Sequence, residues 1–359
     1  MATERRTESP RGFDLSYGEV TGALGDSVTV LPIVVALGAL TPVSLAHVLA
    51  GFGVFQVVWG LRYRLPVSVE PMKALAGLAI GGALTYGELV AAGLLAGATL
   101  LAVGASGTLA TVERYVGRSV VRGIQFAVAL ILLEAGVGLA VDAPAVGAAG
   151  LVLATAVALV DSRSAALAVL GVGVAWTVLA TGLPPVRPPT PALFPAGGPR
   201  LTGDALAGTA GQLAMTVGNA AVATSLLFSD LFDAEVASDD LATSMGAMSL
   251  VAVPLGALPM CHGSGGLAGK HAFGARTGAA NLVIGALYLL AAPVAGLWLG
   301  FPMALLGALL VVVAAQLGQV ALAARSPLAV GIGVLGLLTN VGLAFAVGVV
   351  AYHASERWR

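Results

Sequence analysis

Two short polar motifs recur along the chain, in the same order and at similar spacing. The first half has Gly25-Asp26 and later Pro71-Met72-Lys73, and the second half has Gly218-Asn219 and later Pro259-Met260-Cys261. A carboxylate, an amide and an ammonium group inside apolar segments are expensive to bury and bind ions or carry protons when they are retained there. The recurrence indicates an internal repeat whose polar residues face one cavity. Chance recurrence in a chain rich in Gly and Ala is the alternative.

Pro71 and Pro259 each lie in a short extended stretch that leads into an apolar, Gly-rich stretch, within residues 65–84 and 257–273. Proline suits the first turn of a helix, so each is predicted to begin a half-helix near the membrane centre. A helix N-terminus carries about half a positive charge and free N–H groups, so two facing N-termini would bind an anion. Glycine lets an anion approach the backbone, and hydroxyl groups add donors. The residues expected to do so are Gly263, Gly265, Thr29, Thr224, Ser225 and Ser264.

Lys73 sharpens this prediction. The chain has only two lysines, Lys73 and Lys270. Lys73 falls in the first turn of a half-helix, where the helix dipole disfavours a cation. A charge at the membrane centre also costs about 2.5–3.5 kcal/mol on insertion scales. A bound anion would offset this cost, and so would a permanent ion pair with Glu70 or Asp26; both alternatives stay open.

Three residues in the same segments are candidates for carrying protons: Asp26, Glu70 and His262. Carboxylates and a histidine near neutral pH can bind and release protons during transport. Each has a structural alternative, which is a helix–helix hydrogen bond for Asp26, a helix cap for Glu70 and a packed core histidine for His262. The remaining predicted members of the binding site are Gln56, Pro71, Met72, Asn219 and Cys261.

Composition excludes most other classes of protein. The chain is 58% hydrophobic and 10% charged, whereas a soluble domain carries about 25% charged residues. Its net charge of −1 offers no basic field for nucleic acid. The single cysteine, Cys261, excludes an intrachain disulfide. The sequence contains no recognised catalytic or metal-binding motif, so we expect no cofactor and no metal, and a membrane enzyme is the weaker class.

Apolar runs long enough to cross a membrane, which takes about 20 residues, fill most of the chain. Thr339-Asn340 near the middle of the last run, 327–353, would make that run a hairpin of two spans. With the two broken segments this arrangement gives fourteen crossings, seven in each half. The runs are 17–40, 43–61, 87–109, 119–140, 145–160, 165–182, 205–228, 241–256, 278–299, 302–323 and 327–353.

Basic residues fix the expected orientation, because Lys and Arg stay in the cytoplasm. With the N-terminus inside, only Arg187 and Arg200 lie outside, and Lys270 lies at the inner face. We therefore expect a multi-pass protein of the inner membrane with cytoplasmic tails at 1–16 and 354–359. Seven crossings per half invert the two repeats, 17–182 and 204–353, about a Pro- and Gly-rich linker at 183–203. Inverted repeats with broken helices are a secondary-transporter design.

Longer motifs surround these residues: 22–26 (GALGD) with Leu31-Pro32, 71–73 (PMK), 223–227 (ATSLL), and 259–269 (PMCHGSGGLAG) with 273–276 (FGAR). Together they resemble the molybdate transporter family, a branch related to the sulfate permeases, over about residues 18–276. The resemblance implies an all-α fold of seven plus seven inverted spans. It further implies a core domain, 17–110 and 204–299, that carries the anion past a gate domain, 119–182 and 302–353, in an elevator-like movement.

These features predict a secondary active transporter that imports a tetrahedral oxyanion, with molybdate as the first candidate. Proton coupling is expected because importing a dianion against an inside-negative potential costs about 2.3 kcal/mol per charge per 100 mV. The alternatives are a sulfate or tungstate transporter and, less favoured, an oxyanion channel. The expected partners are the oxyanion, protons and the lipid bilayer, without nucleic acid; a homodimer stays open.

Overall fold

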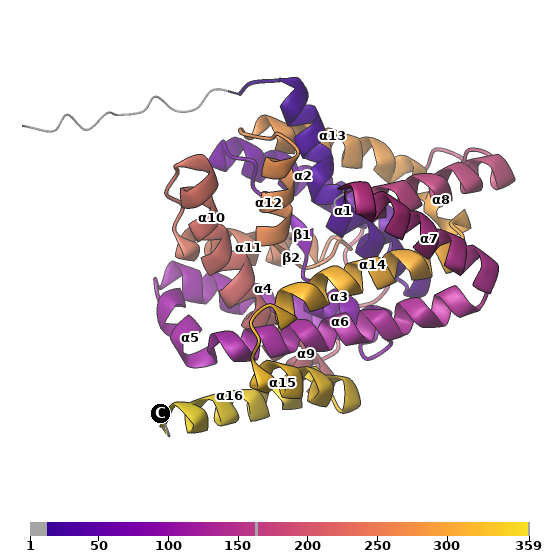
Figure 1. Cartoon of the computed structure of the whole chain (residues 1–359). Coiled ribbons are helices and arrows are strands. Elements are labelled where there is room, and N and C mark those ends of the chain that lie inside the picture. Colours follow the sequence, from indigo (N-terminus) through magenta and orange to yellow (C-terminus); the bar gives the residue numbers. More distant parts are fainter. Residues whose placement is uncertain (1–12, 162–163, 358–359) are drawn as a thin grey trace, which may run out of the picture.

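The computed structural model describes residues 13–161 and 164–357, and helices make up most of them (Figure 1). The first half contains α1 (Tyr17–Leu40), α2 (Leu45–Tyr63), β1 (Glu70–Pro71), α3 (Lys73–Ile80), α4 (Tyr86–Ala105), α5 (Leu109–Val116), α6 (Arg118–Val141), α7 (Pro144–Asp161) and α8 (Ala165–Thr181). The second half contains α9 (Gly203–Met215), the π-helix η1 (Thr216–Val222), α10 (Ala223–Phe232), α11 (Ser238–Ala252), β2 (Met260–Cys261), α12 (Ser264–Ala272), α13 (Ala279–Ala291), the 3₁₀-helix η2 (Ala292–Gly300), α14 (Met303–Leu322), α15 (Pro327–Leu338) and α16 (Val341–Arg357).

The long helices are membrane spans by length and composition. Within the described residues, seven helices are long and apolar enough to cross a bilayer, or eight if α1 counts as one bent span. The bend in α1, 44° between Val28 and Val30, has a cause in Pro32, which removes the hydrogen bond to the carbonyl four residues earlier and crowds it. The protein is therefore an all-α polytopic membrane protein, as predicted.

Most predicted spans agree with the observed helices. The run at 327–353 does break at Thr339-Asn340, between α15 and α16. Residues 354–357, predicted as part of a tail, instead form the last turn of α16. The short helix α5, between two spans, was not predicted. Residues 1–12 and 358–359 of the predicted tails lie outside the described residues.

The two broken segments pair with each other at the centre of the molecule. β1 and β2 run antiparallel, with Glu70 opposite Cys261 and Pro71 opposite Met260. α3 and α12 follow them, so each half-helix is preceded by an extended stretch, as predicted. The prolines belong to the extended stretches rather than to the first turns, because α12 begins only at Ser264. Pro259 suits this position, since its carbonyl accepts a hydrogen bond from Met72 N at 2.9 Å and no N–H is needed.

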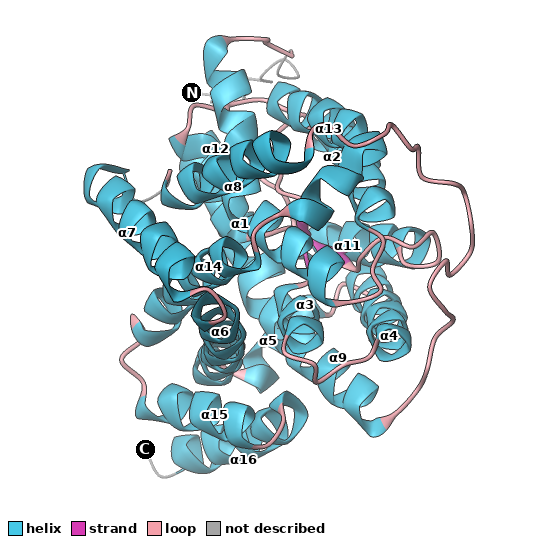
Figure 2. Ribbon diagram, turned by 90° about the vertical axis from the view of Figure 1, so that its right-hand side faces the viewer, coloured by secondary structure: helices cyan, strands magenta, loops and turns pink. Residues whose placement is uncertain are grey.

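The remaining helices form two packed groups on either side of this centre (Figure 2). In one group, α4 packs on α11, and α2 on α13; in the other, α6 packs on α14 and α15. Glycine permits the closest crossings. A Cβ atom at Gly246 of α11 would collide with Leu101 N of α4, and one at Gly136 of α6 would lie 2.9 Å from Gly307 O of α14. Small residues at crossings are how helices pack closely in membranes.

Residues 183–202 of the predicted linker form no helix or strand and run along the surface as a long loop, and its last residue, Gly203, begins α9 (Figure 2). Its backbone is tied down at three places. Arg187 N donates to Pro293 O at 2.7 Å, Phe194 N donates to Pro254 O at 2.7 Å, and Arg200 N donates to Gly87 O at 2.8 Å. The connection between the two repeats is therefore a strap held against the first group of helices.

Candidate functional site

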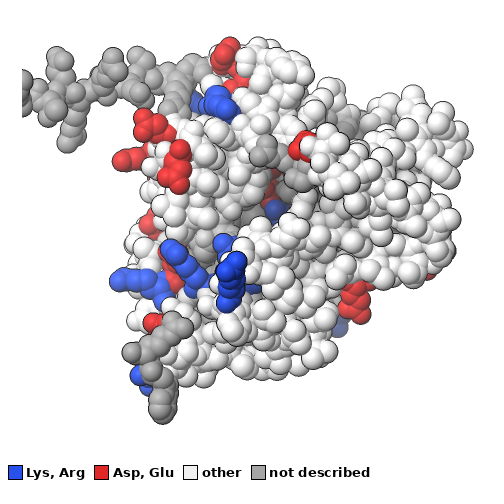
Figure 3. Space-filling view, in the orientation of Figure 1, with Lys and Arg blue, Asp and Glu red and all other residues white. Residues whose placement is uncertain are grey.

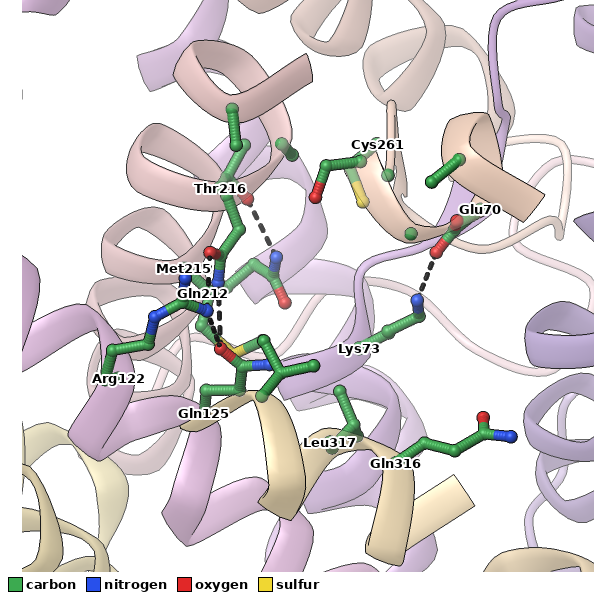
Figure 4. A pocket seen from close by; sticks show the side chains of 18 of the residues that line it. Glu70, Lys73, Arg122, Gln125, Gln212, Met215, Thr216, Cys261, Gln316 and Leu317 are labelled. Atoms are coloured by element: carbon green, nitrogen blue, oxygen red, sulfur yellow. Dashed lines mark hydrogen bonds and ion pairs between the residues drawn. The ribbon is translucent and has the colours of Figure 1, made fainter. Parts of the chain in front are cut away.

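A cavity of about 430 Å³ lies between the two groups of helices, beside the paired broken segments (Figure 4). One wall comes from β1, α3, β2 and α12, a second from α9, η1 and α10, and a third from α6 and α14. Its polar lining residues are Glu70, Lys73, Arg122, Gln125, Gln212, Thr216, Asn219, Cys261, Ser264 and Gln316.

The ion pair between Glu70 and Lys73 borders this cavity. Glu70 Oε2 pairs with Lys73 Nζ, and the two side chains are 1% and 15% exposed. Glu70 Oε1 accepts hydrogen bonds from Ser68 Oγ at 2.9 Å and from Gly266 N at 2.9 Å. A protein carboxylate therefore lies at the N-terminus of α12, where the dipole stabilises negative charge. The same carboxylate offsets the charge of Lys73.

The glycines at the start of α12 differ in what they accommodate. A Cβ atom at Gly263 or Gly266 would collide with the Glu70 carboxylate, so both glycines make room for that side chain. At Gly265 a Cβ atom would meet nothing within 4 Å, and this residue lines the cavity. The first N–H groups of a helix lack acceptors within it. Those of Ser264 and Gly265 are therefore the donors that a ligand in the cavity can use.

The N-terminus of α3 is closed by a side chain of the other repeat. Ala74 N and Leu75 N both donate to Gln212 Oε1, at 2.9 and 3.2 Å. Gln212 Nε2 in turn donates to Thr216 Oγ1 at 2.8 Å. The two half-helices are thus unequal. The first turn of α3 is capped by Gln212. In the first turn of α12, Gly266 N donates to Glu70 Oε1, but within the described residues the N–H groups of Ser264 and Gly265 have no hydrogen-bond partner.

A second ion pair, between Asp26 and Lys270, lies in the core behind the cavity. Both side chains are fully buried, so Lys270 is a core residue of the protein and not an exposed one. Its ammonium group contacts four oxygen atoms: Asp26 Oδ2 at 3.2 Å, Gln56 Oε1 at 2.9 Å, Val67 O at 2.8 Å and Asn281 Oδ1 at 3.1 Å. Gln56 Nε2 and Ser68 Oγ donate to the Asp26 carboxylate at 2.6 and 2.7 Å. This cluster joins α1, α2, α12 and α13.

The structure places several other predicted residues outside the cavity lining. His262 is fully buried, with Nδ1 2.8 Å from Ser68 O and Nε2 2.8 Å from Ser244 Oγ. Thr224 Oγ1 donates to the carbonyl of His262 at 3.1 Å, and Ser225 Oγ donates to Val236 O. Pro71 and Met72 belong to the ladder between the broken segments, and Gln56 belongs to the Asp26–Lys270 cluster. The side chain of Thr29 lies outside the described part of the structure.

The cavity brings together part of the predicted set and adds residues that the sequence analysis missed. The predicted residues that line it are Glu70, Lys73, Asn219, Cys261, Gly263, Ser264 and Gly265. The missed polar residues are Arg122, Gln125, Gln212, Thr216 and Gln316. Spacing was the available signal, since Gln212, Thr216 and Asn219 follow at i, i+4 and i+7, which places them on one helical face.

Comparison with known proteins identifies the family. The family model described as "Molybdate transporter of MFS superfamily" matches residues 18–132 and 204–317, which are corresponding stretches of the two repeats. The chain belongs to the molybdate transporter family. It is 31% identical to molybdate transporter 1 of Arabidopsis thaliana, over 94% of this chain and 87% of that protein. It is 26% identical to molybdate transporter 1 of Chlamydomonas reinhardtii, over 95% and 91%.

Solved structures share the fold of this family member. The transmembrane domain of the cyanobacterial bicarbonate transporter BicA matches with a TM-score of 0.66 at 16% identity, over 95% of this chain and 99% of that one. The murine Solute Carrier 26 family member A9 anion transporter matches with a TM-score of 0.72 at 13% identity, over 97% and 69%. The inverted-repeat transporter fold implied by the sequence is therefore confirmed.

Proposed function

We propose that this protein is a secondary active transporter that imports a tetrahedral oxyanion together with protons, and that molybdate is its main substrate. The observation that carries the proposal is the meeting of Lys73 with the free N–H groups of α12 at one cavity. The names of the curated relatives support molybdate as the substrate.

The substrate would bind where donors converge from two elements. The N–H groups of Ser264 and Gly265 and the hydroxyl group of Ser264 approach from α12, and the Lys73 ammonium group approaches from α3. A tetrahedral oxyanion presents four acceptor oxygens and can use these donors at once. Hydrogen bonds from charged donors are about twice as strong as neutral ones, so Lys73 would contribute most of the affinity.

Glu70 is the proton carrier that the geometry favours among the three candidates. Its carboxylate holds Lys73, which an incoming dianion would need, and it accepts from Gly266 N next to the proposed donors Ser264 and Gly265. Two anions at one site repel each other, so the carboxylate must bind a proton or leave before the dianion binds. Substrate and proton would then bind together. Asp26 and His262 make hydrogen bonds to protein groups away from the cavity, which supports structural roles for both.

Alternating access would move one group of helices past the other. The cavity lies between the proposed core, containing α1–α4 and α9–α13, and the proposed gate, containing α6–α8 and α14–α16. Figure 3 shows charged side chains gathered along the edge where α5 and α10 lie, and a hollow near the middle with charged atoms at its bottom. We assign the charged edge to the cytoplasmic side of the inner membrane, with both termini in the cytoplasm, because basic residues favour that side.

Uptake of labelled molybdate into proteoliposomes tests the proposal. Molybdate should accumulate when the outside is acidic, and tungstate and sulfate should be measured as competitors. Preferred accumulation of sulfate would make the protein a sulfate transporter. Uptake that only dissipates a molybdate gradient, independent of pH, would make it a channel. Protein-free liposomes and the Lys73→Ala variant are the controls, and equal uptake by all three preparations would refute the proposal.

A further inference from the structure

The wall of the cavity opposite Lys73 carries a second cation, Arg122 of α6 (Figure 4). Its Nη1 atom donates to Gln125 Oε1 at 2.9 Å and lies 3.4 Å from Asn219 Oδ1. Both partners are neutral amides. Among the described residues, no carboxylate forms an ion pair with this guanidinium group.

Charge in the cavity is therefore unevenly balanced. Glu70 and Lys73 neutralise each other at one wall, and Arg122 remains as the unbalanced charge at the other. Both of its hydrogen bonds leave from Nη1, and within the described residues Nη2 and Nε have no hydrogen-bond partner. A guanidinium group binds oxyanions through two parallel N–H bonds, and this geometry suits it better than lysine for the purpose.

The position of Arg122 is built by close packing between the two repeats. A Cβ atom at Gly218 would lie 3.0 Å from Val121 Cγ2, so this glycine lets η1 approach α6. The next residue, Asn219, then reaches Arg122, and its Nδ2 atom lies 3.3 Å from Gln125 Oε1. Asn219 lies within a π-helix, an element that occurs often at functional sites.

We propose that Arg122, positioned by Gln125 and Asn219, forms a second oxyanion-binding site, which receives the substrate between solution and the site at Lys73 and α12. The inference rests on the proposed transport function. The cavity has room for about a dozen water molecules, so a five-atom oxyanion can occupy one wall without touching the other. Arg122 also belongs to the proposed gate, and an anion bound to both walls would tie the two groups together. We therefore expect the anion to occupy the second site only transiently during transport.

The test compares Arg122→Gln with Arg118→Gln in the proteoliposome uptake assay. Arg118 is an exposed arginine one turn earlier on α6 that does not line the cavity. Arg122→Gln should lower Vmax/KM for molybdate about tenfold, the loss expected for a charged hydrogen-bonding partner. Vmax should stay within about twofold. Added salt should slow uptake less than in the unchanged protein, because a steering charge has gone. Arg118→Gln should leave all three quantities unchanged, and Arg122→Lys should restore part of Vmax/KM.

Two results would overturn the inference. One is an unchanged Vmax/KM in Arg122→Gln, and the other is an equal fall of Vmax and Vmax/KM with the salt dependence kept, which marks a structural role. If Arg122→Gln does not fold, Asn219→Asp places a carboxylate beside the guanidinium and should lower Vmax/KM similarly; normal uptake by this variant would also overturn it. Absence of uptake in the unchanged protein would instead refute the transport function itself.

Discussion

The two lysines of the chain lie in the two half-helices, but their ion pairs differ in kind. Lys270 lies in the last turn of α12, fully buried, and its ammonium group contacts four protein oxygens including Asp26 Oδ2. Lys73 is the first residue of α3 and is partly exposed to the cavity, and within the described residues Glu70 is its one ion-pair partner. The first pair is closed on all sides by the protein, whereas the second borders space that a ligand can enter.

This difference distinguishes a structural ion pair from an ion pair that borders the proposed binding site. A buried charge with every partner in place fixes the elements around it, and removing one partner is costly. A pair at a cavity wall can exchange a partner for a substrate at much smaller cost, because its lysine is partly exposed to the cavity where a ligand can enter. Gly266 lies between the two pairs, since a Cβ atom there would collide with carboxylate oxygens of both Glu70 and Asp26.

The largest expected effect comes from breaking the closed pair. Lys270→Met leaves the Asp26 carboxylate buried without its cation, and we expect the free energy of unfolding to fall by about 3–5 kcal/mol. Thermal unfolding in detergent measures this. The double variant Lys270→Met with Asp26→Leu should regain part of the loss, because neither charge of this pair then remains buried. A single variant as stable as the unchanged protein would show that the pair is not structural.

Breaking the open pair should affect transport rather than folding. Lys73→Ala should lower molybdate uptake about 100-fold, because charged hydrogen bonds to the substrate are lost, while the protein elutes as a folded species with a similar unfolding temperature. Initial uptake rates measured against protein amount give the result. Uptake that persists at normal affinity would make Lys73 a structural residue.

Two neighbouring glycines of α12 sharpen the comparison. Gly266→Ala should lower uptake at least about tenfold and also reduce stability, because the new methyl group collides with both carboxylates. Gly265→Ala should change uptake only a few-fold, since its Cβ atom meets open space. Uptake and thermal unfolding of the two variants are measured side by side. Equal effects would contradict the arrangement of Glu70 against α12.

The smallest effect is expected in the pH dependence. In Glu70→Gln the side chain can no longer bind a proton, so uptake should lose its rise toward acidic pH while a few-fold lower rate remains. Uptake measured between pH 5 and 8 in both proteins, with about equal protein per liposome, checks this. A pH profile that keeps its slope in the variant would assign coupling to another group.

The sequence predicted the broken segments well because the signals there are local. A proline in an extended stretch, followed by small apolar residues, has few solutions inside a membrane. It did not identify Lys270 as a core residue, because the groups that surround its ammonium, from Asp26, Gln56 and Asn281, lie on three other helices, two of them distant in sequence. The sequence analysis used Arg122 only as one of the basic residues that set the expected orientation. Its sequence position near the start of α6 does not reveal that α6 and η1 line one cavity.

The ladder between Glu70–Pro71 and Met260–Cys261 has a consequence for selectivity. It joins β1 and β2, and with them the half-helices α3 and α12 of the proposed binding site, through backbone hydrogen bonds. In the proposed elevator-like movement, the spacing between the two half-helices would therefore stay the same on both sides of the membrane. The protein would then discriminate among oxyanions of different radius equally well from either side of the membrane.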